Sequence, residues 1–253
     1  MQLSVIVPML NEEGNAETLC TEIQSSLATA GLEFEIICVD DGSTDGTGAR
    51  LQSLVPRIPQ LRILRHACRS GQSTALLSGI LAARAAVIAT LDGDGQNDPA
   101  DIPKLWQWYQ QAGTQTPEQP VMIAGHRIHR RDHWRKRVSS RLANRLRLRL
   151  LQDGTPDTGC GLKVFPRDSY LRFPAFNHNH RYFCALMIRS GGRVESVAVG
   201  HRPRVAGRSN YGTWDRFKVG ISDLLGVMWL MRRPVRVTVA EITTGSLAEK
   251  SQK

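Results

Sequence analysis

The chain has 253 residues, of which 33 are Lys or Arg and 23 are Asp or Glu, so its formal net charge is +10. This length fits one large domain, and a hydrophobic fraction of 41% is sufficient for a full core. The positive excess predicts an anionic partner, which could be nucleic acid, an anionic membrane surface or a phosphorylated ligand.

The five cysteines are scattered, odd in number and without a C-x-x-C pair. They argue against a disulfide framework and a zinc site, and for a reducing compartment. The first residues lack a basic region, so we expect a strand there and not a secretory signal. The longest apolar run, 224–231, is too short to span a bilayer. We therefore expect a protein that is soluble or lies on a membrane without crossing it.

Strand and helix patterns alternate along the first half of the chain. We predict strands at 3–10, 34–43, 61–66, 87–94 and 121–127, and helices at 15–31, 45–55, 70–86 and 99–113. This alternation predicts an α/β fold with a doubly wound, mostly parallel sheet and helices on both faces. Ligands of such sheets bind beyond the carboxyl ends of the strands.

Polar clusters follow three of the predicted strands, at 11–13, 40–43 and 92–96. Ordinary turn chemistry is one explanation, because Asp, Gly, Ser and Asn are typical turn residues. Three acidic clusters at one edge of a sheet favour a ligand site instead. The first half contains neither G-K-[ST] nor G-x-G-x-x-G at these turns, which disfavours the common nucleotide-binding loops.

The third cluster predicts a metal site. Residues i and i+2 of a strand point to the same side, so Asp92 and Asp94 would present their carboxylates together. Gln96 adds an amide oxygen, and Gly93 leaves room for a ligand to approach the backbone. Such oxygen ligands suit Mg²⁺ or Mn²⁺ shared with phosphate oxygens. On the same edge, Asp40 and Asp41 could bind a base and ribose.

Four stretches, VIVPMLNEEGN, IICVDDGSTDGT, SGQSTALLSG and IATLDGDGQNDPADIP, together resemble the family-2 glycosyltransferases with the A-type nucleotide-sugar fold (GT-A). The nearest branch is that of the dolichol-phosphate mannose synthase-like, polyprenyl-phosphate glycosyltransferases. The resemblance covers about residues 3–231. We expect one glycosyltransferase domain over 1–240, with a nucleotide-sugar-binding half at 1–115, an acceptor and membrane-interface half at 116–240, and a disordered tail at 241–253.

The resemblance implies site residues. The nucleotide sugar would bind Pro8, Leu10, Glu12, Asp40, Asp41, Asp92, Gly93 and Asp94, and the metal would bind Asp92, Asp94 and Gln96. The phosphate of the lipid acceptor would bind Arg127, Lys136, Ser140, Arg181 and Arg204. Catalysis would rest on Asp92, Asp94, Arg204 and Asp157. Leu10 departs from the family, in which an aromatic residue is frequent, and Cys160 in DTGCGLKVF takes the place of a small residue. His180 is a weaker candidate.

Residues 126–149 hold ten Arg or Lys and one Asp. Trp134, Val138, Leu142, Leu146 and Leu150 repeat every four residues beside a line of arginines, which is typical of a helix in a membrane interface. The alternatives are an internal amphipathic helix, or a strand, because RLRLRL also alternates. Nucleic acid is disfavoured as the partner, because the segment has one aromatic residue for base stacking. The apolar residues of 214–233 are spaced as in a helix, which predicts a second helix in the membrane interface. A membrane-anchoring partner could also supply the membrane contact.

The predicted function is inverting, metal-dependent transfer of a sugar from a UDP- or GDP-linked donor to a polyprenyl phosphate. We expect it at the cytoplasmic face of a membrane, with the protein bound peripherally to the anionic surface and not to nucleic acid. A phosphate acceptor is already ionised at neutral pH and needs no strong base, whereas a hydroxyl acceptor would need Asp157. The alternatives are a saccharide or protein acceptor, a Mg²⁺-dependent phosphatase, or a non-catalytic membrane or nucleic-acid binder.

Overall fold

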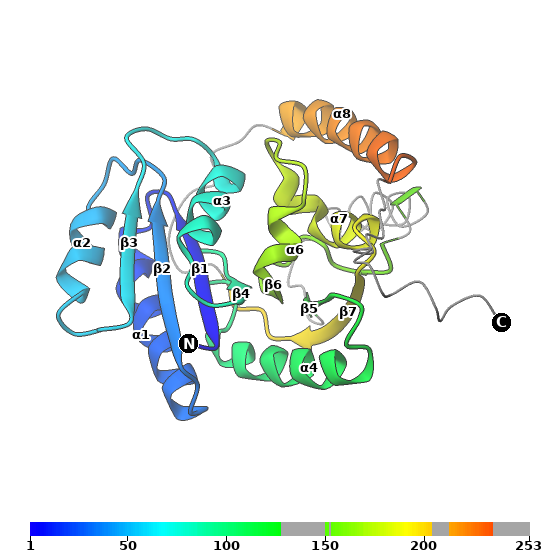
Figure 1. The fold of residues 1–253 in the computed structure, drawn as a ribbon. Helices are drawn as coiled ribbons and strands as arrows, with labels where there is room; N and C mark the ends of the chain where they lie inside the picture. Colours follow the sequence, from blue (N-terminus) through cyan, green and yellow to red (C-terminus); the bar gives the residue numbers. More distant parts are fainter. Residues whose placement is uncertain (128–149, 152, 204–212, 235–253) are drawn as a thin grey trace, which may run out of the picture.

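The computed structural model describes residues 1–127, 150–151, 153–203 and 213–234. Its centre is a seven-stranded sheet with the strand order β3-β2-β1-β4-β6-β5-β7 (Figure 1). The strands are β1 (Leu3–Met9), β2 (Phe34–Asp40), β3 (Leu61–Arg65), β4 (Val87–Thr90), β5 (Val121–Arg127), β6 (Lys163–Pro166) and β7 (Arg193–Val199). The helices are α1 (Glu13–Thr29), α2 (Thr47–Leu54), α3 (Gln72–Ala82), η1 (Pro99–Asp101), α4 (Ile102–Gln115), α6 (Arg167–Leu171), η2 (Asn179–Tyr182), α7 (Phe183–Arg189) and α8 (Thr213–Met231).

Strand direction decides which chain ends meet. β1 to β4 are parallel, β6 runs antiparallel to both β4 and β5, and β7 is parallel to β5. The carboxyl ends of β1, β2, β4 and β5 therefore share one edge with the amino end of β6. The register pairs Thr90 with Lys163 and Ala124 with Lys163, so the chain that enters β6 passes beside the exit of β4.

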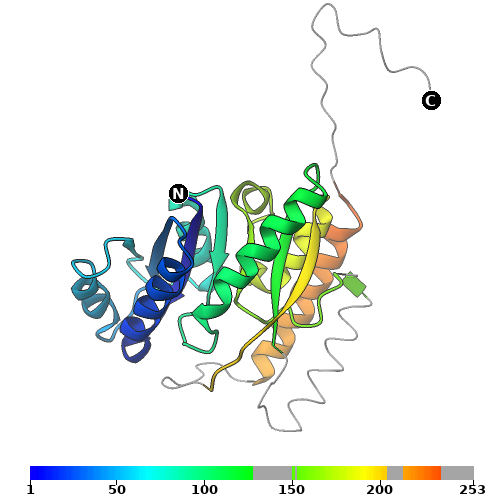
Figure 2. The same cartoon turned by 90° about the horizontal axis from the view of Figure 1, so that it is seen from below.

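Helices cover both faces of the sheet, and the strands β1 and β2 are buried along their whole length. Val5 and Val7 of β1 belong to the core layer beneath α1, α2 and α4, while Ile6 belongs to the layer beneath α3, α6, α7 and α8. Figure 2 shows α4 and α8 on opposite sides of the β5–β7 part of the sheet. Helix α3 approaches β1 closely, since a Cβ on Gly79 would lie 2.4 Å from Ile6 Cγ2.

The predicted α/β class, the mostly parallel sheet and the two helical layers are confirmed. The fourth strand is shorter than predicted. It ends at Thr90, so Asp92 and Asp94 lie on the turn beyond it and not on a strand. The elements β6, α7 and β7 were missed. The basic segment lies outside the described residues from 128 to 149, as does the tail from 235, so the helix and the disorder predicted there stay predictions.

The helix predicted at 214–233 is present as α8 and lies along the outside of α7 (Figure 1). Val227 is buried in the core, and Leu224 and Met228 pack against it. Ile221, Leu225 and Trp229, spaced every four residues, are instead 45%, 59% and 56% exposed. These three residues are called here the outer stripe of α8. Among the residues that the structure describes, no helix has the length and apolarity needed to cross a bilayer.

Candidate active site

The predicted nucleotide-binding residues lie at the exits of β1 and β2. The backbone N–H groups of Asn11 and Glu12 donate to Ser43 Oγ and Thr47 Oγ1, both at 2.9 Å, which ties the end of β1 to the turn after β2. Glu12 also accepts from Asn15 Nδ2 at 2.6 Å. Leu10 is half-buried here, and Pro8 is buried in β1. The backbone thus brings the first two clusters together as the sequence predicted.

The two aspartates at the exit of β2 have different surroundings. Asp40 is fully buried; its Oδ1 accepts from the Ser43 N–H at 2.8 Å, and its Oδ2 lies 3.4 Å from Arg65 Nε without a hydrogen-bond partner. An unsatisfied buried carboxylate oxygen is costly, and a donor from a ligand would satisfy it.

Asp41, in contrast, is saturated by the protein. Its Oδ1 accepts from the Ser70 N–H and contacts His66 Nδ1, and its Oδ2 accepts from the Gly71 N–H, all at 2.8 Å. These bonds fix the position of the loop that leads into α3, so Asp41 stabilises the backbone beside the site. Direct binding of the base by Asp41 would have to compete with three internal contacts.

The acidic turn after β4 lies beside the end of β1. A Cβ on Gly93 would lie 2.7 Å from the Pro8 carbonyl oxygen, so only glycine lets the turn pack here. Asp92 Oδ1 accepts from Gln72 Nε2 at 2.9 Å, and Asp94 Oδ1 accepts from the Gln96 N–H at 3.2 Å. The turn, and not the alternation of a strand, therefore brings the two carboxylates together.

The two carboxylates influence each other. Burial raises the pKa of Asp92, and the negative charge of Asp94 raises it further. The charges of Lys163 and Arg127 offset part of this rise. An additional positive charge beside Asp92 would therefore stabilise its ionised form.

The segment before β6 closes over Asp92. Thr90 Oγ1 donates to the Gly161 carbonyl at 2.6 Å, and a Cβ on Gly161 would lie 2.3 Å from Asp92 Cγ. Lys163 is buried and donates to the carbonyl oxygens of Thr158 and Cys160. The lysine therefore holds the turn that packs against Asp92.

Arg127 and Asp157, two of the predicted site residues, pair with each other. Arg127 Nε and Nη2 donate to Asp157 Oδ2 and Oδ1 at 2.7 and 2.8 Å, and both side chains are nearly buried. Burial alone would lower the pKa of the Arg127 guanidinium, but its hydrogen bonds with Asp157 and the charge of Asp157 raise it. Both oxygens of Asp157 are thus occupied by a permanent cation.

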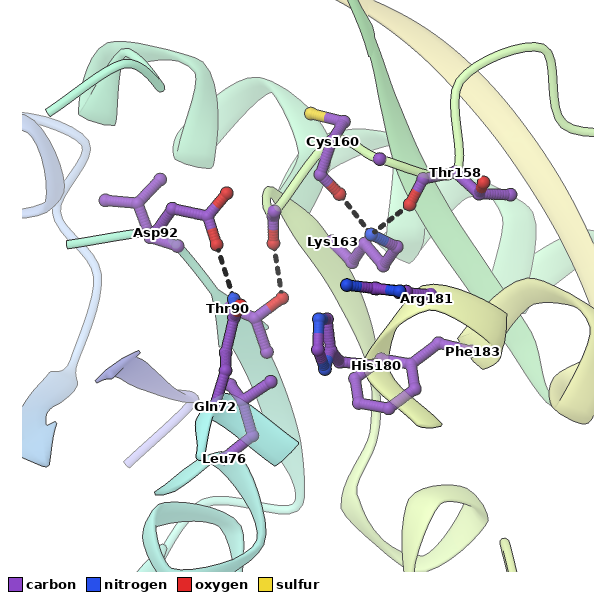
Figure 3. A pocket seen from close by; sticks show the side chains of 13 residues that line it. Gln72, Leu76, Thr90, Asp92, Thr158, Cys160, Lys163, His180, Arg181 and Phe183 are labelled. Atoms are coloured by element: carbon purple, nitrogen blue, oxygen red, sulfur yellow. Dashed lines mark hydrogen bonds between the residues drawn. The ribbon is translucent and has the colours of Figure 1, made fainter. Parts of the chain in front are cut away.

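A cavity of about 190 Å³ lies between the acidic turn and the second helical layer (Figure 3). Asp92 and Gln72 line one side, and Lys163, His180 and Arg181 line the other. In the part of the chain that the structure describes, the Arg181 guanidinium has no hydrogen-bond or ion-pair partner. The cavity therefore joins an acidic turn to a cationic wall. Lys136, Ser140 and Arg204 lie outside the described residues, so their predicted roles stay predictions.

The comparison with known proteins decides the family. Residues 4–173 match the family model described as glycosyl transferase family 2. The chain belongs to this family. The expected resemblance to family-2 glycosyltransferases is therefore confirmed.

Relatives of this glycosyltransferase act on lipid phosphates, as their names state. A dodecaprenyl-phosphate galacturonate synthase from Rhizobium johnstonii is 33% identical over 240 residues, which are 93% of this chain and 69% of that protein. An undecaprenyl-phosphate 4-deoxy-4-formamido-L-arabinose transferase from Edwardsiella ictaluri is 29% identical over 214 residues, 83% of this chain and 63% of that protein. The chain thus spans about two thirds of the length of these curated relatives.

Solved structures confirm the GT-A fold. Glucosyl-3-phosphoglycerate synthase from Mycobacterium tuberculosis, solved with Mg²⁺ and UDP, matches with a TM-score of 0.65 at 19% identity, over 91% of this chain and 79% of that one. A mannosyltransferase from Pyrobaculum calidifontis, solved with GDP-Man and Mn²⁺, matches with a TM-score of 0.63 at 18% identity, over 90% of this chain and 63% of that one.

The glycosyltransferase offers a limited set of metal ligands. Within the described residues, no group of three or more His, Cys, Asp or Glu side chains could hold a metal ion. Asp92 and Asp94 nevertheless fit a cation that takes its remaining ligands from phosphate and water, as Mg²⁺ commonly does. The pKa of Asp92 is raised by burial and by the charge of Asp94, so a cation beside the two carboxylates would favour their ionised forms.

Three side chains of this site were not predicted. Gln72 and Ser73 lie in the SGQSTALLSG stretch, which was used only for the family resemblance, and Lys163 lies in DTGCGLKVF. A lysine in a buried strand, between Leu162 and Val164, was the available signal for Lys163, because lysine is rarely buried without a purpose. Gln72 and Ser73 carry no comparable signal, since their roles depend on which partners the fold brings to them.

Proposed function

We propose that this glycosyltransferase moves a sugar from a UDP- or GDP-linked donor to a polyprenyl phosphate, with inversion at the anomeric carbon. The observation that carries this proposal is the cavity that joins Asp92 to the unpaired guanidinium of Arg181. One end suits a donor diphosphate and the other suits a second anion. The names of the relatives, which are polyprenyl-phosphate sugar transferases, support the same acceptor.

The donor diphosphate would lie at the acidic turn. Asp92 and Asp94 would hold Mg²⁺ or Mn²⁺ there, with Gln96 as a further ligand. When bound, the cation supplies positive charge that stabilises the departing nucleoside diphosphate. The charges of Lys163 and Arg127 favour the ionised form of Asp92, because they offset part of the rise in its pKa.

The acceptor would enter from the cationic side. Its phosphate oxygen is ionised at neutral pH, because the second pKa of a phosphate monoester is about 6. This oxygen attacks the anomeric carbon, and the bond from that carbon to the nucleoside diphosphate breaks, with its electron pair leaving on the diphosphate. Arg181 holds the two anions near each other, as Lys136, Ser140 and Arg204 would in the family resemblance.

The pairing of Arg127 with Asp157 favours a phosphate acceptor over a hydroxyl one. A sugar or protein hydroxyl would need a carboxylate base, and Asp157 was the candidate. Both of its oxygens already accept from Arg127, so a hydroxyl proton would have to compete with this pairing. Arg127 and Asp157 therefore have a structural role beside the site. Arg127 would bind the acceptor phosphate through the guanidinium N–H groups that do not donate to Asp157.

The site would face the cytoplasmic surface of a membrane. The outer stripe of α8 presents three apolar side chains, and Arg232 and Arg233 follow it in the chain. Apolar residues beside arginines suit an anionic interface, where each Arg contributes about 1 kcal/mol. The scattered cysteines fit the reducing side.

The test is transfer from labelled UDP- and GDP-sugars to undecaprenyl phosphate in detergent, followed by organic extraction of the lipid product. Wild-type protein with Mn²⁺ should label the lipid from at least one donor. Asp92→Asn should abolish labelling, and Asp168→Asn, an exposed aspartate on α6, should not. Labelling of a soluble saccharide in place of the lipid would refute the proposed acceptor.

A further inference from the structure

His180 forms part of the cavity wall opposite the acidic turn. It lies in η2, and its Nδ1 is 2.7 Å from Oγ of Ser73, which is buried at the start of α3. Figure 3 shows the imidazole next to Arg181, across the cavity from Gln72 and Asp92. A contact between residues 107 positions apart fixes the imidazole relative to both helices that form the wall.

The contacts of Ser73 are compatible with a neutral imidazole that carries its proton on Nε2. The backbone N–H of His180 also points to Ser73 Oγ, at 3.5 Å, so this oxygen already accepts one hydrogen. When the hydroxyl donates its own hydrogen to Nδ1, the ring hydrogen lies on Nε2, and this is the tautomer that we assign. Within the described residues Nε2 has no partner, so a neutral N–H donor is presented to the cavity.

The surroundings keep this imidazole neutral. Burial, together with the charges of Arg181, Lys163 and His178, lowers the pKa of His180 to about 3. A neutral ring that makes one hydrogen bond suits an uncharged partner such as a hydroxyl group. The anions at the site have cations beside them already.

We propose that His180 is a specificity-determining residue that donates from Nε2 to a hydroxyl of the donor sugar, with Ser73 as its positioning residue. This inference rests on the proposed function. The cavity begins at Asp92, where the diphosphate would bind, and ends at His180, so the group that extends into it from a diphosphate is the sugar. Its volume of about 190 Å³ exceeds the space of a few waters, each of about 30 Å³, and suits one sugar ring.

The test compares the binding of nucleotide and nucleotide sugar by calorimetry with Mn²⁺ and without acceptor. His180→Ala should weaken binding of the nucleotide sugar about tenfold and leave binding of the nucleotide alone unchanged, because one neutral hydrogen bond is lost. Ser73→Ala should have a smaller effect in the same direction. His178→Ala is the matched control, because His178 pairs with Asp223 and does not line the cavity. It should change neither affinity.

A set of donors that each lack one sugar hydroxyl makes the test specific. Wild type should bind one of these deoxy-sugars about tenfold less well than the parent, and His180→Ala should bind the two equally. A merely structural role would weaken all donors alike, or weaken the nucleotide as well, and either result would overturn the inference. A change confined to the KM for the lipid would also overturn it. Failure of lipid transfer with intact sugar discrimination would refute only the proposed acceptor.

Discussion

Gly161 permits a perturbation of Asp92 that leaves every charged group in place. A Cβ at this position would lie 2.3 Å from both Cγ and Oδ2 of Asp92, and 2.5 Å from its Oδ1. Ordinary contact begins at 3.4 Å, so Gly161→Ala must move the carboxylate or the turn by about 1 Å. No positive φ is involved at Gly161, so the effect is steric and does not arise from backbone strain.

A displacement of about 1 Å at a reacting centre can lower the rate about a hundredfold. We therefore expect Gly161→Ala to reduce kcat/KM by about that factor and to raise the Mn²⁺ concentration needed for half-maximal activity. Overpacking should also cost about 1–3 kcal/mol of unfolding free energy, measured by urea denaturation.

The matched control is Gly113→Ala on α4, where a Cβ would meet nothing within 4 Å. It should leave transfer unchanged and stabilise the helix by up to about 1 kcal/mol. If Gly161→Ala kept kcat/KM within threefold of wild type with an unchanged Mn²⁺ requirement, Asp92 would not need its observed position. The metal assignment would then be refuted.

Three further predictions concern the Arg127–Asp157 pair, His180 and the outer stripe of α8. Asp157→Asn breaks the nearly buried Arg127–Asp157 pair and should cost about 3 kcal/mol of unfolding free energy. The double variant Arg127→Met/Asp157→Asn should cost less than the sum of the two single variants, measured by urea denaturation. Additive costs would show that the pair is not coupled. His180 is neutral in the fold but protonated when unfolded at acidic pH, so it destabilises the protein as pH falls from its ordinary pKa of 6.5 toward about 3. His180→Gln should therefore reduce the loss of stability between pH 7.5 and 5 by about 2 kcal/mol, whereas an identical loss in both proteins would place a protonated imidazole in the fold. Replacing the outer stripe of α8 by Ser should weaken sedimentation with anionic vesicles and leave nucleotide binding intact; unchanged sedimentation would assign the membrane contact elsewhere.

The sequence predicted the fold of the first half of the chain well, because β1, β2 and β4 are largely apolar runs followed by polar turns. Val5, Ile6 and Val7 are buried on both faces of the sheet, and this pattern identifies a parallel strand without tertiary information. Asp40 and Asp92 follow such strands, so the shared edge was predictable from the order of elements alone.

The second half of the chain was less predictable, since its strands pair out of chain order. β6 is inserted between β4 and β5, and only this pairing brings Lys163 and Gly161 to Asp92. The exposed face of α8 was also hard to predict, because the sequence places all of its apolar residues in one stripe. In the fold Leu224 and Met228 turn inward and Leu225 turns outward, a division set by packing against the second core layer.

The central claim is that Asp92 and Asp94 hold the cation that receives the charge of the departing nucleotide. The most direct measurement is a crystal soaked with Mn²⁺ and a nucleotide sugar, with the ion located by its anomalous scattering. The account predicts one strong peak bonded to both carboxylates and to the diphosphate, at about 2.1 Å from the carboxylate oxygens. A peak bound to the diphosphate but to neither aspartate would contradict it.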